Sequence, residues 1–151
     1  MMYNRNAVPR GFEVADAFKG YFVQLPERST SASAGYDIRA FEDADIPPHT
    51  MVTIHSGIKA FMQSDEVLKI YPRSSIGIKH GIILGNSVSI IDADYYQTGK
   101  DILLCFYNLS DKTYHIYRND RVAQGIFQKY LTCGDEPDGV RTGGLGSTGD
   151  K

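Results

Sequence analysis

Short runs of alternating apolar and polar residues follow one another along the chain, and glycine, proline, asparagine or aspartate separates most of them. This pattern is typical of short β-strands joined by turns. It predicts strands in the segments 20–25, 34–40, 51–54, 57–61, 67–71, 88–91, 102–106, 114–117 and 121–131. A short helix is expected after Pro72, where two serines follow the proline. The chain is therefore expected to form one β-rich domain.

Two apolar runs in the segment 85–106 enclose a polar stretch and predict a β-hairpin. Because side chains alternate between the faces of a strand, Val88, Ile90, Asp92 and Asp94 would share one face. An unpaired carboxylate in an apolar row is costly, so such an aspartate usually grips a cation or activates a water. The alternative is that both aspartates only shape the turn.

Length and charge narrow the class of protein. The 151 residues suffice for a core without disulfides, and a net charge of −2 gives no reason to expect a nucleic-acid partner. No segment approaches the ~20 apolar residues of a membrane span, and the start of the chain lacks the apolar run of a signal peptide. Cys105 and Cys133 lack metal-type spacing, which favours free thiols. We therefore expect a cytoplasmic protein with no membrane partner.

Two further segments carry candidate chemistry. Gly35 precedes Asp37 on a predicted strand, where the glycine permits close approach and the carboxylate could hold hydrated Mg²⁺. The alternative is an acid at a strand edge. Arg73 and Ser74 open the predicted helix, where exposed N–H groups, a hydroxyl and a guanidinium favour a phosphate. Here the alternative is a helix N-cap beside a structural ion pair.

The last residues differ in composition from the rest. The segment 135–151 is nearly free of apolar residues, and its run RTGGLGSTG combines one cation with glycines and two hydroxyls. Such a tail cannot contribute to a core, but its amides could wrap phosphate oxygens. It lacks the order of a Walker loop. We expect a single domain over 1–134 and a flexible tail over 135–151 that closes an active site.

Five segments together resemble, in order and spacing, the five motifs of the trimeric dUTPases. They are AGYDI (34–38), PRSSIGIKHGI (72–82), GNSVSIIDADY (85–95), RVAQGIF (121–127) and RTGGLGSTG (141–149). The resemblance implies an all-β, jelly-roll-like β-barrel and a homotrimer whose active sites are shared between subunits, each closed by a neighbour's tail. It also implies hydrolysis of dUTP to dUMP and pyrophosphate, which keeps uracil out of DNA and supplies dUMP for thymidylate synthesis.

The same resemblance implies roles for individual residues. Asp92 would be the general base that activates water, and Asp37 would hold Mg²⁺ through its water shell. Tyr95 would lie under the deoxyribose and exclude a 2′-hydroxyl, while Asn86 would bind the uracil edge. Ser74 and Gln124 would contact the phosphates. The remaining residues implied in substrate binding are Arg73, Ser75, Ile91, Arg141, Leu145, Gly146, Ser147 and Thr148. Arg73 and Arg121 are expected to be partly structural.

Three departures from the family pattern affect these expectations. Leu145 stands where the family usually has a phenylalanine that stacks on uracil, so weaker closure of the tail is expected. The last motif is one residue shorter after Arg141, which affects the role of that arginine. The stretch 96–101 is longer than the usual hairpin tip and is a candidate surface for a protein partner.

Two other functions compete with dUTP hydrolysis. A deaminase related to dCTP deaminase would need an acid placed at C4 of cytosine, whereas the IDADY context resembles the phosphohydrolase. A nucleotide-binding regulator, such as some phage-borne members of the family are, would have exchanged turnover for partner binding. A bacterial cell or a phage-infected host cell is the expected setting.

Overall fold

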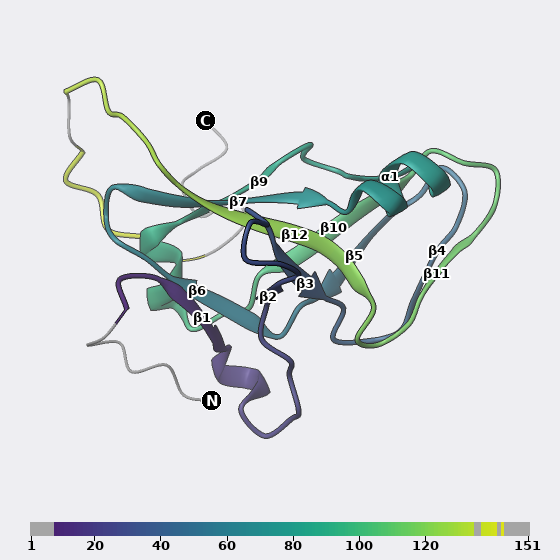
Figure 1. Ribbon diagram of the computed structural model, residues 1–151, viewed down its shortest axis with the longest axis horizontal. Coiled ribbons are helices and arrows are strands. Elements are labelled where there is room, and N and C mark those ends of the chain that lie inside the picture. The colour runs from purple at the N-terminus through teal and green to yellow at the C-terminus, as the bar shows by residue number, and fades with distance from the viewer. Residues whose placement is uncertain (1–7, 135–136, 142, 144–151) are drawn as a thin grey trace.

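The chain consists mainly of short antiparallel strands with one α-helix (Figure 1). This computed structural model describes residues 8–134, 137–141 and 143. The strands are β1 (Gly11–Val14), β2 (Glu27–Arg28), β3 (Tyr36–Arg39), β4 (Ala44–Ile46), β5 (Met51–His55), β6 (Ile58–Phe61), β7 (Glu66–Pro72), β8 (Ile82–Leu84), β9 (Ser89–Asp92), β10 (Leu103–Asn108), β11 (Tyr114–Ile116) and β12 (Arg121–Lys129). The helices are α1 (Ser74–His80) and two 3₁₀ turns, η1 (Asp16–Phe18) and η2 (Ala93–Thr98). The prediction of a β-rich domain with one short helix is confirmed.

The strands form several small antiparallel sheets around one core. The largest has the order β2-β3-β12-β7-β9, and a second has the order β5-β10-β8. The pairs β1-β6 and β4-β11 complete the described sheets. β12 is the central strand of the largest sheet, and Figure 1 shows it running alongside β7 across the molecule. This arrangement places the ends of β3, β7 and β12 side by side.

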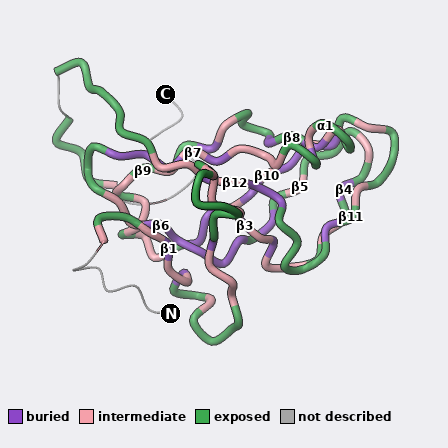
Figure 2. The backbone as a smooth tube through the Cα atoms, viewed as in Figure 1, coloured by how far each residue is buried: buried purple, intermediate pink, exposed green. Residues whose placement is uncertain are grey.

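The core lies between these sheets, where the inward positions of the strands are apolar (Figure 2). Gly125 of β12 allows tight packing, because a Cβ there would lie 2.9 Å from Leu68 Cδ1 and 3.3 Å from Ile38 Cδ1. Gly125 therefore leaves room for side chains of the two neighbouring strands, β3 and β7. Among the described helices, none has the length and apolar character to cross a membrane.

The predicted hairpin within 85–106 is wrong. β9 pairs with β7, whereas β10 pairs with β5 and β8, so the two strands belong to different sheets. Between them η2 turns the chain, and Gly99 ends that turn at φ 68°. Both strands have the predicted apolar character, but their pairing depends on residues far away in the sequence.

The stretch 96–101 is accordingly no free hairpin tip. Gly99 packs against Asp16, whose N–H donates to the Gly99 carbonyl over 3.0 Å. Asp101 is buried at 7% exposure, and its carboxylate accepts N–H bonds from Ser56 and Gly57. The partner surface predicted here is therefore reduced, and only Gln97 and Lys100 are exposed within it.

Two other strand predictions need correction. The segment 20–25 forms no strand, since Tyr21 and Phe22 are exposed and Tyr21 N–H closes a turn onto Phe18. The segments 51–54 and 57–61 are strands, but they do not pair with each other. β5 joins β10 and β6 joins β1, and Gly57 at φ 71° turns the chain between the two sheets.

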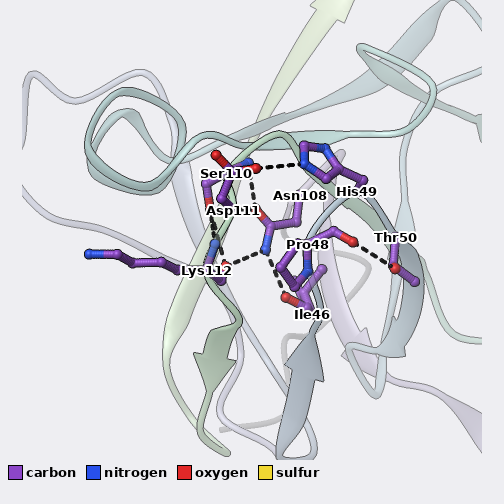
Figure 3. A network of polar contacts seen from close by, with 8 residues as sticks. All are labelled: Ile46, Pro48, His49, Thr50, Asn108, Ser110, Asp111 and Lys112. Atoms are coloured by element: carbon purple, nitrogen blue, oxygen red, sulfur yellow. Dashed lines mark hydrogen bonds and ion pairs between the residues drawn. The ribbon is translucent and has the colours of Figure 1, made fainter.

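A buried amide fastens the loop that follows β10 (Figure 3). Asn108 is fully buried, and its Nδ2 donates to the carbonyls of Ile46 and Lys112, each over 2.8 Å. Its Oδ1 accepts bonds from the N–H and the hydroxyl of Ser110. The amide thus forms hydrogen bonds with carbonyls that the loop would otherwise leave unpaired. These bonds join β4 to the turn before β11.

A partly buried ion pair fastens the start of the chain to β7. Arg10 Nε lies 2.9 Å from Oε1 and 3.0 Å from Oε2 of Glu66, whose side chain is 3% exposed. The hydrogen bond from Arg10 lowers the pKa of Glu66 below its ordinary value of 4.5. A carboxyl with a lowered pKa stabilises the fold above its ordinary pKa, and this contribution is lost as the pH falls through the folded-state pKa.

Replacing Arg10 by alanine is therefore expected to destabilise the protein in a pH-dependent way. We expect a loss of about 2 kcal/mol in the free energy of unfolding at pH 7, less than for a fully buried pair because Arg10 is 40% exposed. The difference from wild type should narrow below pH 4.5, where protonation removes the buried charge. Urea unfolding at pH 7 and pH 3.5 measures the free energy of unfolding of both proteins. Lys129→Ala, which removes the exposed ion pair with Asp65, is the control. An equal loss at both pH values would contradict this assignment.

Candidate functional site

A polar cleft of about 540 Å³ opens where β7 ends, beside the first residues of β3 and the middle of β12. The register places Asp37 of β3 opposite Gln124 of β12, and β7 leads directly into α1. The residues lining the cleft are Ser29, Ser33, Ala34, Gly35, Asp37, Arg73, Ser74, Ser75, Gln124 and Ile126. Three segments with predicted chemistry, each remote in sequence from the others, thus meet in one cleft.

Asp37 is held between two arginines. Its Oδ1 lies 3.1 Å from Arg73 Nε, its Oδ2 lies 3.2 Å from Arg121 Nη1, and Ser29 donates a hydrogen bond to Oδ2 over 3.0 Å. The side chain is only 15% exposed. Two guanidiniums against one carboxylate leave a net positive charge, which suits an anionic ligand. The structural ion pair considered for Arg73 is therefore present.

The helix start presents unoccupied hydroxyls. Ser74 and Ser75 are exposed, and neither hydroxyl has a hydrogen-bond partner in the described part of the chain. The N-cap position of α1 is Arg73, without a side-chain capping bond, so the proposal that Ser74 is the N-cap is wrong. β7 ends at Pro72, two residues before Ser74. Both serines at the start of α1 line the cleft.

Gly35 allows the cleft to form. A Cβ at this position would lie 2.6 Å from Gln124 Oε1 and 3.3 Å from Gln124 Cβ. The Gln124 side chain occupies that space and donates weakly to the Pro72 carbonyl over 3.4 Å. Gly35 therefore sets the position of the Gln124 amide at the cleft wall.

A second group of predicted residues surrounds the end of β9. Asp92 ends the strand, and Asp94 lies in η2, so the two do not continue one strand face as predicted. Ile90 is 52% exposed, and the Asp92 and Asp94 side chains are 52% and 53% exposed, so this row faces outward. The carboxylates are thus accessible on the isolated chain.

Arg141 of the tail binds both carboxylates. Its Nε donates to Asp94 Oδ1 over 2.6 Å, and its Nη2 donates to Asp92 Oδ2. The side chain is 15% exposed. The hydrogen bond that Arg141 donates to Asp94, more than any other interaction, raises the pKa of Arg141 above its ordinary value. The Arg141 guanidinium, a group that suits phosphates, is here paired with two carboxylates.

Tyr95 follows β9 in η2, whereas Asn86 precedes the start of β9. The Tyr95 hydroxyl donates to the Asp101 carbonyl over 3.0 Å, and burial raises the pKa of the phenol, which stays neutral. Asn86 is exposed in the turn before β9, where its Oδ1 accepts a bond from the Ser89 hydroxyl. Ile91 is half-buried beside Leu68 of β7. These residues border an open surface on the isolated chain.

The two groups of residues lie at opposite ends of β7. Asp92 pairs with Val67 near the start of the strand, whereas Ser74 of the cleft follows its last residue, Pro72. Five residues of extended chain separate Val67 from Pro72, which corresponds to about 17 Å. One chain therefore does not bring Asp92 and Ser74 into one site. Leu145, Gly146, Ser147 and Thr148 fall outside the described residues.

The sequence analysis did not identify several residues in the cleft and around Asp92. Ser29 and Ser33 line the cleft, and Arg28 fixes their loop through bonds to the carbonyls of Ser31 and Ser33. A serine-rich stretch directly before Gly35 was the available signal. The pairing of Asp94 with Arg141 had no local signal, because 47 residues separate the two.

The order of these residues matches a known family. The family model described as dUTPase matches residues 22–148. The chain belongs to the dUTPase family. A deoxyuridine 5'-triphosphate nucleotidohydrolase of Lactococcus lactis is 43% identical over 146 residues, which cover 93% of this chain and 97% of the relative. A Helicobacter pylori protein of the same name is 34% identical over 131 residues, which cover 83% of this chain and 88% of the relative.

Solved dUTPases share the fold. The dUTPase of Streptococcus mutans superposes with a TM-score of 0.76 at 36% identity, over 83% of this chain and 99% of that one. The dUTPase of Staphylococcus bacteriophage 80alpha has a TM-score of 0.71 at 18% identity, over 85% and 94%, a likeness that bears on the fold alone. The predicted jelly-roll-like β fold and the predicted family are both confirmed.

Proposed function

We propose that this dUTPase-family chain is an enzyme that hydrolyses dUTP to dUMP and pyrophosphate. The observation that carries the proposal is the cleft, in which Arg73 and two free hydroxyls meet the Gln124 amide. Guanidinium, hydroxyl and amide donors suit a chain of phosphates. The matching names of the Lactococcus and Helicobacter relatives support dUTP as the nucleotide.

Asp92 would serve as the general base. It would take a proton from a water whose oxygen bonds to the α-phosphorus, while the bond from that phosphorus to the bridging α,β oxygen breaks. Pyrophosphate would leave with the electron pair of the broken bond. A carboxylate is ionised at neutral pH, so its low basicity is offset by its placement against the water.

Recognition of the nucleoside would fall to residues that precede and follow Asp92 in the chain. Asn86 and the neighbouring backbone would bind the uracil edge, and Ile91 would border it. Tyr95 would exclude a 2′-hydroxyl, and the hydrogen bond from its hydroxyl to the Asp101 carbonyl supports this role because it orders the ring. Readout of this kind discriminates strongly, because a wrong base leaves buried polar groups unpaired.

Mg²⁺ would be held jointly with the substrate. Within the described residues, no three carboxylate, histidine or cysteine side chains cluster as a metal site. Asp37 contributes one carboxylate, already bonded to arginines, which fits an outer contact through water. The ion would supply charge neutralisation on the phosphates, which would provide its direct ligands. A phage phi11 dUTPase of the same fold is described with a structural Mg(II) ion.

A complete site would require more than one chain. We propose a homotrimer, because the cleft and Asp92 lie about 17 Å apart along β7 and a neighbouring copy could bring them together. Arg141, with Ser147 and Thr148, would bind the β- and γ-phosphates, and Leu145 and Gly146 would cover the base. The relatives are bacterial proteins, and we place the reaction in the cytoplasm of a bacterial or phage-infected cell.

Pyrophosphate release from dUTP tests the function. UTP, dTTP and dCTP serve as competing substrates, each with Mg²⁺ and then with EDTA. Selective, Mg²⁺-stimulated turnover of dUTP is expected. Ammonia release from dCTP would instead indicate a deaminase, and binding of dUTP without turnover would indicate a regulator.

Replacing Gly35 by alanine is expected to raise the KM for dUTP about tenfold, because the new Cβ would displace the Gln124 amide from the phosphates. The fold should survive, since the clash involves a side chain at the edge of the cleft. Steady-state kinetics and thermal unfolding measure both effects. Gly20→Ala is the matched control, because no atom lies within 4 Å of its Cβ position. A wild-type KM in Gly35→Ala would remove Gln124 from phosphate binding.

A further inference from the structure

The Tyr95 ring is fastened at its hydroxyl, and the residue that accepts this bond also carries a buried carboxylate. The hydroxyl donates to the backbone carbonyl of Asp101 over 3.0 Å. The side chain of Asp101 is buried. A buried carboxylate destabilises a fold unless hydrogen bonds compensate for the loss of water. The partners of the carboxylate therefore show what holds Asp101 in place.

Three consecutive residues of the turn between β5 and β6 hold the Asp101 carboxylate. The N–H groups of Ser56 and Gly57 each donate to Oδ2 over 3.2 Å. His55 Nδ1 lies 3.1 Å from the same oxygen, and because a carboxylate only accepts, this nitrogen carries the hydrogen. Gly57 has the left-handed conformation that turns the backbone here, with φ at 71°. These bonds fasten Asp101 to the turn.

The residue after Asp101 is bonded to the same turn. The N–H of Ile102 donates to the Ile58 carbonyl over 2.8 Å, and the Ser56 hydroxyl donates to the Ile102 carbonyl over 2.5 Å. Ile102 is fully buried. The Asp101 carbonyl belongs to the peptide group that joins these two residues. A shift of this carbonyl would therefore strain bonds on both sides of it.

The backbone of η2, which carries Tyr95, has bonds of its own. The Thr98 hydroxyl donates to the Tyr95 carbonyl over 2.8 Å, and the Gly99 N–H donates to the Tyr96 carbonyl over 3.2 Å. These bonds fix the backbone of the turn and not the far end of the Tyr95 ring. That end depends on the bond to Asp101.

Exclusion of a 2′-hydroxyl depends on how firmly the ring is held. A pocket that merely lacks room for one added hydroxyl discriminates by about 10²-fold. This discrimination falls when the ring can tilt far enough to admit one more oxygen. Tyr95 is only partly buried, so packing covers part of its ring. The bond from its hydroxyl adds a fixed point at the end of the ring that lies farthest from the backbone.

We propose that Asp101 is a positioning residue that strengthens the preference for deoxyribose over ribose by holding the Tyr95 ring. This inference rests on the proposed function, in which Tyr95 lies under the sugar. The carboxylate fixes the Asp101 carbonyl to the turn between β5 and β6, and the carbonyl fixes the phenol. The turn at 55–57 thereby acts on the sugar through Asp101 and Tyr95. Such support of a contact residue by its neighbours makes a binding site more selective.

Calorimetric titration with nonhydrolysable analogues of dUTP and UTP measures the sugar preference without turnover. Asp101→Asn keeps the shape of the side chain but removes its charge, which weakens its bonds to the turn. We expect the ratio of the two dissociation constants to fall about tenfold. Tyr95→Phe keeps the ring but removes the hydroxyl, and it should lower the ratio by a similar factor. Asp45→Asn, which alters an exposed pair with His115, is the matched control and should keep the wild-type ratio.

The double variant separates positioning from a general loss of structure. If Asp101 acts through the Tyr95 hydroxyl, Asp101→Asn should have no further effect once that hydroxyl is gone. The ratio in the double variant should then match that of either single variant within about twofold. A further fall of about tenfold in the double variant would overturn the proposal, and so would a wild-type ratio in Asp101→Asn.

NMR of the free protein detects the hydrogen bond of Tyr95 in the absence of nucleotide. Labelling with ¹³C at tyrosine Cζ should give one signal for each of the ten tyrosines, and the Tyr95 signal is the one that Tyr95→Phe lacks. This signal should shift in Asp101→Asn, because the phenol loses a fixed acceptor. An unshifted Tyr95 signal in Asp101→Asn would overturn the proposal.

His55→Ala is a milder variant that serves if Asp101→Asn does not fold. It removes one donor with a half-exposed side chain and leaves both N–H bonds to the carboxylate. The Tyr95 signal should shift, and the ratio of dissociation constants should fall about threefold. A wild-type signal together with a wild-type ratio would overturn the proposal.

Pyrophosphate release from dUTP decides the proposed function separately. Selective binding of the dUTP analogue without turnover would reject hydrolysis, whereas the ratios and the NMR signal would still decide the role of Asp101. Turnover of dUTP with an unchanged preference in Asp101→Asn would keep hydrolysis and reject the role of Asp101.

Discussion

Replacing Asp92 by asparagine is expected to lower the kcat for dUTP by about 10²–10⁴-fold while nucleotide binding persists. The amide has nearly the shape of the carboxylate, but it cannot accept the proton of the attacking water. Asp92 is 52% exposed at the end of β9, so the substitution disturbs no core. Its bond to Arg141 would weaken, but Arg141 keeps Asp94.

Pyrophosphate release and calorimetric titration with a nonhydrolysable dUTP analogue measure the two effects separately. Asp111→Asn is a suitable control, because that carboxylate is 96% exposed and pairs only with His49 among the described residues. It should leave kcat within about twofold of wild type. Near-normal turnover in Asp92→Asn would exclude Asp92 as the base.

Truncation after Gly139 is expected to abolish most activity, with a loss of about 10²-fold or more in kcat/KM. It removes Arg141 together with the glycine, serine and threonine residues proposed to wrap the phosphates. The described residues of the tail before Arg141 are exposed and contribute nothing to the core. The melting temperature should therefore change by no more than about 2 °C.

Kinetics, thermal unfolding and analytical ultracentrifugation of the truncated chain test this expectation. A chain that ends at Gly149 is the control, since it loses only two residues beyond the last motif. Dissociation of the truncated protein to monomers would show that the tail holds subunits together. Full activity of the truncated chain would remove the tail from the site.

The contacts of Arg141 and Asp37 suggest a common principle in this site. Both groups are paired with opposite charges before any nucleotide is present. Such pairs keep the side chains ordered, so less conformational entropy is lost when the substrate binds. The triphosphate would then take the place of carboxylates in these ion pairs. Its own negative charge would pair with the arginines.

Much of the candidate site was predictable from local sequence, because it depends on the chemistry of residues at the ends of strands, next to glycine or proline. Gly35 lies directly before β3 and Asp37 lies on it. Ser74 begins the helix after Pro72, as expected. Proline and glycine restrict or free the backbone wherever they occur, so these local features persist in the fold. The meeting of these segments in one cleft was implied by the family resemblance.

The partners of each strand were decided by the tertiary structure. The apolar runs of β9 and β10 are evident in the sequence, but a run with apolar residues on both faces suits either a hairpin or two separate sheets. Burial against β7 on one side and against β5 and β8 on the other determined the outcome.

The sequence by itself determined the β-rich domain, the short helix, the candidate anion-binding residues and the family. The tertiary structure alone decided that Ser74 and Asp92 lie at opposite ends of β7, and that Arg141 contacts Asp94. Composition and periodicity act over a few neighbouring residues. These positions depend instead on strand register and on a contact that spans 47 residues, and both arise only when the whole core packs.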